Sequence, residues 1–449
     1  MTAIATNAFK KTLIESLIAD VADSDNTYYI ALGKADQWDE NETVPSTVNT
    51  TEEERKFRSQ MQAIKKMSDI SFVASRYNWS SGTTYSAFTD ASALSSAGTY
   101  YVLTESQRVY ICLEQGKDAT GVAVISTVNP DTIGTSTDAD RLADGYVWKY
   151  LFTLTALNSN KYLAANFFPV SKLTASTSNI ETAQLNVQNA AVAGSIVGYR
   201  LVSGGADYPT GATATINGDG TGAALDLTVD ATSGSVVKVS LADSSDGNLA
   251  FGAGYTVADI TIADSNNEAA VIRPIISRAG IGADPRDDIN ATFVMMNAKP
   301  AGDEGGDFLV DQDFRQVGIL KNPTDHSGTD FTAGTGSALR TLTISGVSGT
   351  FAADTLVRGS TSGAGAYVDK YSGSTLFIHQ NQETGFTAFT GNEGIVDSDN
   401  PTTNTATLVG VDSNGEFNPF SGDLLYVENR NPVIRDAAQT EDIKIIFQL

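Results

Sequence analysis

In the last seven residues of the chain every second side chain is apolar, with Lys444, Ile446 and Gln448 between them, and this pattern limits the structure they can form. The apolar residues at every second position are Ile443, Ile445, Phe447 and Leu449. A period of two is typical of a β-strand that buries one face. Because residues near a chain end are ordered only when they are docked, we expect this strand to pack into a core.

A second strand is predicted upstream, where Leu425 and Val427 alternate with their neighbours in the same way. The segment 429–432 reads Asn-Arg-Asn-Pro and is rich in residues that favour turns. We therefore expect a turn at 429–432 between two strands.

The composition indicates a folded, β-rich protein. A length of 449 residues is enough for about three domains of roughly 150 residues each. Glycine is frequent, with 40 residues, while hydrophobic residues still make up 41% of the chain. This balance favours short strands joined by turns over a disordered chain.

The charge and hydropathy exclude two classes of partner. There are 53 acidic against 29 basic residues, a net charge of −24, which repels the phosphates of nucleic acid and favours solubility. No segment approaches the ~20 consecutive apolar residues of a membrane span. Glu15 and Asp20 interrupt the N-terminal apolar run, so no secretion signal is predicted. We expect neither nucleic acid nor membrane as a partner.

Residues 3–22 are predicted to form an amphipathic helix, because their apolar residues recur at helical spacing. These residues are Phe9, Leu13, Ile14, Leu17, Ile18 and Val21. A strand is expected to follow at 27–32.

A second helix is predicted from Thr51, because Glu54 follows at the spacing of a capping box. Glutamates at 52–54 suit its N-terminus, and lysines at 65–66 suit its C-terminus. Its expected apolar stripe consists of Phe57, Met61 and Ile64.

The region 71–152 is expected to contain strands and turns, most clearly at 100–103, 109–113 and 146–154. The only cysteine, Cys112, lies in the apolar run 109–113, which excludes an intrachain disulfide. We interpret Cys112 as a small buried residue rather than a nucleophile.

The region 173–284 contains an internal repeat. Segments beginning at Gly204 and Phe251 each consist of a glycine-rich turn, a tyrosine, an apolar run, a polar turn and a second apolar run. A two-stranded unit cannot bury its own face, so we expect the copies to pair in a small β module. A further strand is expected at 235–241.

The region 324–420 has a similar composition. Short apolar runs recur every 8–12 residues between Gly/Ser turns, which indicates a compact all-β domain.

Few residues have the chemistry of a catalyst. The chain has two histidines, His326 and His379. His326 follows Asp325, but the nucleophile elbow is absent and 324–328 is interpreted as a polar linker. His379 is interpreted as a strand residue. We therefore expect no enzyme activity.

The sequence also predicts no metal and no cofactor. One cysteine and two distant histidines cannot form a structural zinc site. Residues 217–222 imitate the start of a calcium loop, but Thr228 stands where a glutamate is required. The carboxylates Asp303, Glu304 and Asp307 lie in a glycine-rich loop that is expected to be solvated, and no phosphate-binding loop is present.

Several segments resemble, in the same order, one family: the dimeric baseplate wedge subunit, gene product eight type, of T-even-like contractile-tailed bacteriophages. They read YYIALGKADQWDEN at 28–41, RYNW at 76–79, VYICL at 109–113, DGYVWKYLF at 144–152, FRQVGILKNP at 314–323, YVENRNPVI at 426–434 and QTEDIKIIF at 439–447. The residues that carry the resemblance, called the signature residues below, are Trp38, Trp79, Asp144, Gly145, Tyr146, Trp148, Phe314, Arg315, Gln316, Pro323, Tyr426, Glu428, Asn429, Arg430, Pro432, Gln439 and Phe447.

The resemblance implies a discontinuous body, since it lapses across two long stretches. The body would comprise 1–172, 285–323 and 421–449, with β modules inserted at 173–284 and 324–420. We therefore expect a β-rich α+β fold, with a sandwich-like body and two small all-β inserts.

The resemblance further implies a structural role in the virion. The chain would assemble in the host cytoplasm as a homodimer, contact other wedge subunits of the tail baseplate, and take part in triggering contraction. No small-molecule substrate is implied. Trp148 is interpreted as core, while Trp38 lies in a polar segment and is the better candidate for an interface.

The alternative is a receptor-binding or glycan-binding tail protein. Its aromatic residues for stacking on sugars would be Tyr208, Tyr255, Tyr367, Tyr371 and Phe377. The competing interpretation is that these rings fill small cores.

Overall fold

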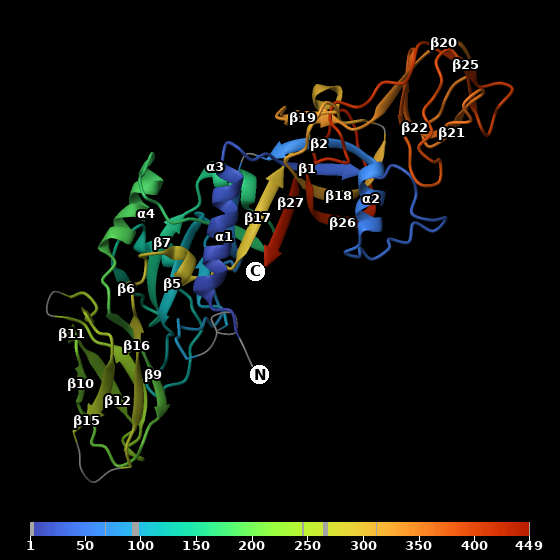
Figure 1. Ribbon diagram of the computed structural model, residues 1–449. Helices are drawn as coiled ribbons and strands as arrows, with labels where there is room; N and C mark the ends of the chain where they lie inside the picture. Colours follow the sequence, from blue (N-terminus) through green and yellow to red (C-terminus); the bar gives the residue numbers. More distant parts are fainter. Residues whose placement is uncertain are drawn as a thin grey trace. The chain divides into compact units, whose positions relative to one another are not determined.

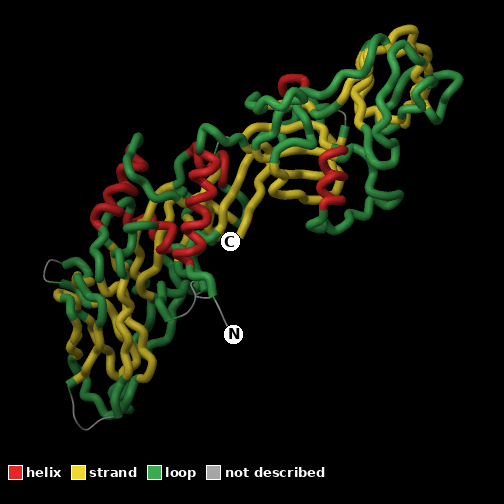
Figure 2. Tube along the Cα trace, viewed as in Figure 1, coloured by secondary structure: helices red, strands yellow, loops and turns green. Residues whose placement is uncertain are grey.

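The computed structural model describes residues 4–67, 69–91, 98–244, 247–263, 268–310 and 312–448. The fold is a β-rich α+β fold, as predicted, with many small sheets and few helices (Figure 1, Figure 2). The helices are α1 (Asn7–Ala22), α2 (Thr51–Ser59), α3 (Ala156–Tyr162), α4 (Asn179–Ala190) and α5 (Pro285–Asp288), with 3-10 turns η2 (Pro130–Ile133) and η3 (Glu304–Gly306). No helix in the described ranges is long and apolar enough to cross a membrane.

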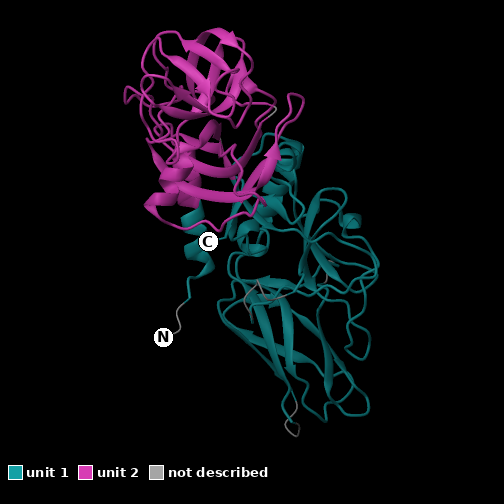
Figure 3. Cartoon of the chain, turned by 90° about the vertical axis from the view of Figure 1, so that its right-hand side faces the viewer, with its two compact units in different colours: residues 1–14, 71–295, 446–449 teal, residues 15–70, 296–445 magenta. Residues whose placement is uncertain are grey.

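The chain forms two compact units, and each is assembled from separate stretches of sequence (Figure 3). Unit 1 contains residues 1–14, 71–295 and 446–449, and unit 2 contains residues 15–70 and 296–445. The proposed division into a body and two inserted modules stays a prediction.

A five-stranded antiparallel sheet forms the first part of unit 2. Its strands, in spatial order, are β19 (Thr335–Ser337), β2 (Met61–Met67), β1 (Tyr28–Gly33), β18 (Asp313–Lys321) and β26 (Asp423–Ile434). One face buries a cluster that includes Tyr29, Phe57, Ile64, Leu320 and Phe417. Strand β1 confirms the strand predicted at 27–32, and it is buried along its whole length because it lies in the middle of the sheet.

The second predicted helix is correct at its start and wrong at its end. The N-cap is Thr50, whose hydroxyl accepts from the Glu53 amide at 3.2 Å, one residue before the predicted capping box. The helix ends at Ser59, and Met61 to Met67 continues as strand β2. Pairing of β2 with both β1 and β19 overrides the local helical pattern, so Lys65 and Lys66 lie on a strand.

Strand β26 also corrects a prediction, because it runs unbroken through the expected turn at 429–432. Two steps along β18, from Phe314 to Gln316, correspond to four steps along β26, from Val433 to Asn429. The turn-favouring residues, with Pro432 among them, therefore form a bulge within the strand, where a missing amide is tolerated.

A second irregularity reverses the orientation expected for Leu425. Ile319 pairs with Tyr426 and Leu320 pairs with Leu424, so Leu425 is an extra residue in the ladder. Its side chain is exposed, while Leu424 and Val427 pack against the core of the sheet.

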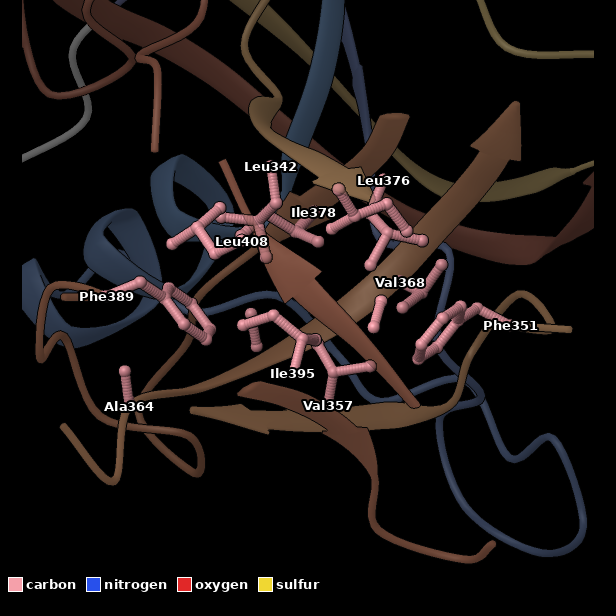
Figure 4. Close-up of a cluster of buried hydrophobic side chains, with 13 residues drawn as sticks. Leu342, Phe351, Val357, Ala364, Val368, Leu376, Ile378, Phe389, Ile395 and Leu408 are labelled. Atoms are coloured by element: carbon pink, nitrogen blue, oxygen red, sulfur yellow. The ribbon is translucent and has the colours of Figure 1, made fainter. Parts of the chain in front are cut away.

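A closed barrel forms a second part of unit 2, and all of its strands lie within 340–408. Its strands, in order around the barrel, are β20 (Arg340–Ser348), β23 (Thr375–His379), β22 (Gly365–Ser372), β21 (Leu356–Gly359), β24 (Gly394–Asp397) and β25 (Thr405–Leu408). The interior is filled by aliphatic side chains and by Phe351 and Phe389 (Figure 4). Closure removes the free edges that such short strands would otherwise expose.

Unit 1 contains a four-stranded sheet ordered β4 (Tyr101–Leu103), β5 (Arg108–Glu114), β7 (Val147–Thr153) and β6 (Ala139–Arg141). The first three confirm the strands predicted in 100–154. Cys112 is fully buried in the same cluster as Tyr110, Trp148 and Tyr150, as predicted. Val187 of α4 also joins this cluster, although α4 lies in the stretch predicted to be an inserted module.

The repeat region of unit 1 pairs as the sequence predicts. Its strands are β9 (Ser195–Ser203), β10 (Ala214–Gly218), β11 (Thr221–Ala223), β12 (Leu225–Val229), β13 (Val236–Leu241), β14 (Phe251–Ala253), β15 (Ala258–Ile262) and β16 (Val271–Ser277). Strands β10 and β15 come from equivalent positions of the two copies and pair antiparallel. Strands β11 and β14 also pair antiparallel between the copies, but from different positions in the repeat. The expectation that each copy covers the other is therefore confirmed.

A further four-stranded sheet has the order β27 (Ile443–Gln448), β17 (Phe293–Ala298), β3 (Ile70–Ser75) and β8 (Phe167–Val170). Strand β27 confirms the predicted C-terminal strand. Ile443 and Ile445 are buried, and Phe447 is only half-buried. Leu449 lies outside the described residues. Ile446, on the opposite face, packs against the cluster of Val73, Tyr162 and Met295, so both faces of this strand meet apolar residues.

Helix α1 is confirmed over 7–22, whereas residues 4–6 of the predicted helix 3–22 precede its first turn and residue 3 lies outside the described ranges. Ile14 and Val21 are buried, whereas Phe9 and Leu13 are exposed. Successive residues of a helix are about 100° apart around its axis, so Phe9 and Leu13 point more than 90° away from Ile14. The predicted apolar side of α1 is therefore only partly buried.

Candidate functional site: two signature networks and a buried histidine

The first group of signature residues lies in unit 1 around the loop before β7. The Asp144 carboxylate accepts from the Ser126 hydroxyl at 3.1 Å and from the amides of Thr127 and Val128 at 2.8 and 3.0 Å. Trp79 donates its indole N–H to the same Ser126 hydroxyl at 3.3 Å. Asp144 therefore fixes a loop by capping backbone amides, which is a structural use of a carboxylate.

The next signature residues extend this network into the core. Gly145 has φ of +83°, a conformation that favours glycine. Tyr146 accepts from the Tyr85 amide at 3.1 Å and donates to the Val124 carbonyl at 2.7 Å. Its ring stacks on Trp148 with centroids 6.0 Å apart. The fully buried Trp148 confirms the interpretation of this residue as core.

The second group lies in unit 2 and is centred on Arg315 of β18. The Arg315 guanidinium donates to both carboxylate oxygens of Glu42 at 3.0 and 2.7 Å and lies 2.9 Å from the Asp313 carboxylate. It also donates to the Ala35 carbonyl. The Arg315 side chain is almost completely buried, so the two carboxylates compensate its positive charge, which is no longer hydrated.

The segment 34–45 is attached to β26 by two further bonds. Trp38 donates its indole N–H to the Arg430 carbonyl at 2.9 Å, and Asn429 donates its amide to the Pro45 carbonyl at 3.1 Å. Gln316 on the adjacent strand donates to the Asn429 side chain at 2.8 Å. Trp38 is half-buried rather than exposed, so the loop that carries it is held against the sheet.

The remaining signature residues lie outside these two networks. Phe314 and Pro323 are buried, and Pro432 lies in the bulge of β26. Tyr426 donates to Glu428 at 2.8 Å within the same strand. Gln439 is exposed, and Phe447 is half-buried on β27.

Sequence reasoning missed a buried cluster of ionisable residues around His379. The His379 Nδ1 atom lies 2.8 Å from the Asp369 carboxylate, and Nε2 lies 3.5 Å from the Asp36 carboxylate. His379 is at the end of β23, and Asp369 is the bulged residue of the paired strand β22. Asp36 follows β1, so the cluster joins the barrel to the five-stranded sheet within unit 2.

The charge state of this cluster follows from its surroundings. Burial lowers the pKa of His379, but the carboxylates of Asp369 and Asp36 outweigh this effect and raise it to about 10. Burial acts to raise the pKa of Asp36, but the hydrogen bond and the charge of His379 hold it below its ordinary value. The cluster is therefore an ion pair near neutral pH, with His379 as the cation.

This assignment predicts that the protein loses stability at alkaline pH. Because the folded-state pKa of His379 is raised from an ordinary ~6.5, its contribution is fully present below pH ~6.5 and is lost as pH rises towards 10. We expect the Tm of the wild-type protein to fall by several degrees between pH 7 and pH 10, measured by circular dichroism. The His379→Gln protein should have a lower Tm at pH 7, and its Tm should fall less between pH 7 and pH 10. The exposed His326→Gln is the matched control, and an equal pH dependence of all three proteins would contradict the assignment.

The other candidates from the sequence have structural roles. Asp325 caps the turn at Ser327 and Thr329, beside the exposed His326. Asp219, in the calcium-like loop, binds the amides of Thr256 and Val257. In the described ranges, no group of three or more His, Cys, Asp or Glu residues is arranged to hold a metal ion.

The carboxylates of the glycine-rich loop are separated by their contacts. Glu304 forms an ion pair with Lys65 of β2. Asp307 is buried at the end of η3 instead of being solvated, contrary to the sequence-based expectation. Comparison of the chain with protein-family models and with curated proteins found no match.

Proposed function

We propose that the protein is a structural subunit of the baseplate wedge of a contractile phage tail. The observation that carries the proposal is that many of the signature residues form two hydrogen-bonded networks. Segments that are far apart in the sequence and that carry the family resemblance meet in the Asp144 network and in the Arg315 network. In both, the polar side chains hold loops and strands together.

The chemistry of these networks suits a structural subunit. Asp144 binds loop amides, and Arg315 is buried between two carboxylates, so removing one partner leaves an uncompensated group in the interior. Such contacts break together rather than one at a time. A wedge subunit that holds the resting tail and then rearranges requires this kind of cooperative element.

The alternative function, glycan binding through the tyrosines and Phe377 named above, finds less support. Tyr208 and Tyr255 are buried in unit 1. Tyr371 packs against Phe351 of the barrel with ring centroids 5.9 Å apart, and Tyr367 stacks on His379 at 5.7 Å. Tyr208, Tyr255 and Tyr371 therefore pack in small cores, which favours the structural interpretation, while Tyr367 and Phe377 are half-buried on β22 and β23.

The proposal predicts a homodimer in solution. We expect light scattering of the purified protein at micromolar concentration to give twice the mass of the chain, as the family resemblance implies. Cryo-imaging of the phage should then place the protein within the baseplate with six-fold symmetry. A monomer that is located on projecting fibres would contradict the proposal and favour the adhesin.

A further inference from the structure

A pocket of about 290 Å³ lies in unit 2 between the end of α2 and strands β20 and β23 of the barrel. Its volume is close to the lower limit of ~300 Å³ that is typical of small-molecule sites. The pocket belongs to neither signature network, and its side chains have no part in the function proposed above.

Two exposed phenyl rings line this pocket. The Phe386 side chain is 58% exposed and that of Phe420 is 52% exposed. Phenylalanine has no polar atom to compensate its contact with water, so two such rings at one pocket point to an occupant with apolar surface.

The polar side of the pocket presents fixed hydrogen-bonding groups. Arg340 is held by the carboxylate of Asp412 and by Gln380 Oε1 at 2.7 Å. The Gln380 amide is in turn fixed by the carbonyls of Gly365 and Thr387 at 2.9 and 2.8 Å. These groups are therefore oriented before any ligand arrives.

Some hydrogen-bonding groups on the polar side of the pocket have no partner among the described residues. The buried Nε atom of Arg340 has no hydrogen-bond partner in the described part of the chain. A buried donor without a partner costs free energy, and because this atom has almost no exposed surface, a ligand oxygen could reach it only if the Arg340 side chain shifted. The exposed Asn414 amide, at the same pocket, can both donate and accept.

The charges at the pocket are already compensated. Arg340 is paired with Asp412, and Arg58 is paired with Glu54. His379, which also lines the pocket, is paired with Asp369. An anionic ligand would gain little from cations that are neutralised in this way. The pocket therefore favours a neutral ligand with many hydroxyl groups.

We infer that this pocket binds a neutral saccharide through a single hexose ring. The C–H faces of a pyranose are apolar and pack on aromatic rings such as Phe386 and Phe420. Its hydroxyl groups can accept hydrogen bonds from the Arg340 guanidinium, and they can both donate to and accept from the Asn414 amide. This activity goes beyond the structural role and uses none of the tyrosines considered above.

The inference is tested with the full-length protein and the methyl glycosides of glucose, galactose, mannose and N-acetylglucosamine. Saturation-transfer NMR at millimolar ligand should detect at least one of them, and titration should give its Kd. We expect Phe386→Ala to weaken binding by about three- to tenfold, the effect of one aromatic contact, and Asn414→Ala to weaken it similarly. Both side chains are exposed, so the Tm should not change.

The matched control is Phe9→Ala, because Phe9 is 56% exposed, lies on α1 in unit 1 and is not one of the residues that line the pocket. Its Kd should equal that of the wild type. Failure of all four glycosides to bind overturns the inference, and so does binding that the Phe386 and Asn414 variants leave unchanged. Binding of sulfate or acetate without any glycoside would show an anion site and would also overturn it.

Discussion

Replacing Trp148 by alanine is expected to lower the free energy of unfolding by about 3–5 kcal/mol. Trp148 is fully buried in unit 1, where it stacks on Tyr146 and meets the Tyr85 ring edge-on at 5.5 Å. Alanine would leave a cavity between these rings that the surrounding strands cannot fill. The change should be measured as a shift in the urea midpoint, followed by far-UV circular dichroism.

The control for this prediction is Trp148→Phe. The indole nitrogen of Trp148 has no hydrogen-bond partner among the described residues, so phenylalanine removes a buried unpaired donor while it keeps most of the ring. We expect a loss well below that of the alanine variant. Equal losses in the two variants would show that packing of this ring is not what stabilises unit 1.

Ile445→Asp is expected to be as damaging, because it places a carboxylate on the buried face of β27. Ile445 lines the same surface of unit 2 as Phe314, Val317 and Val433, and nothing basic there is placed to pair with a new charge except Arg430 and Lys444 at the margin. Burying a poorly paired charge costs about 3–5 kcal/mol. We expect a large fall in Tm and loss of soluble protein.

The matched variant is Gln448→Glu, which introduces the same charge on the same strand at an exposed position. Its Tm should stay close to that of the wild type, because exposed substitutions usually change stability by less than ~0.5 kcal/mol. If the two variants melt at the same temperature, the C-terminal strand does not close the fold.

Patterns that are local in sequence predicted local structure well. The apolar run 109–113 and the alternating pattern 443–448 both correspond to strands, and the short apolar runs between Gly/Ser turns in 324–420 correspond to a β domain that is a closed barrel. Residues 61–67 were predicted as helix because their apolar spacing fits a helix. Two neighbouring strands decide their conformation, and this pairing is not visible within the segment.

The candidate site was predictable only in part, for the same reason. The signature residues could be named from the sequence, but Arg315 meets Glu42, and His379 meets Asp36, only after the chain has folded. The bulge that places Asp369 beside His379 also depends on the pairing of β22 with β23. No spacing rule links residues that are so far apart in the chain.

The boundaries of the two units have a consequence for biosynthesis. They fall inside α1, β3, β17 and β27, at 14/15, 70/71, 295/296 and 445/446. Neither unit is a continuous piece of chain, so no single truncation yields either one intact. A ribosome that has made the first 300 residues has supplied most of unit 1 but less than half of unit 2. Unit 2 must therefore mature late, with the barrel and β26 added to strands that were synthesised long before.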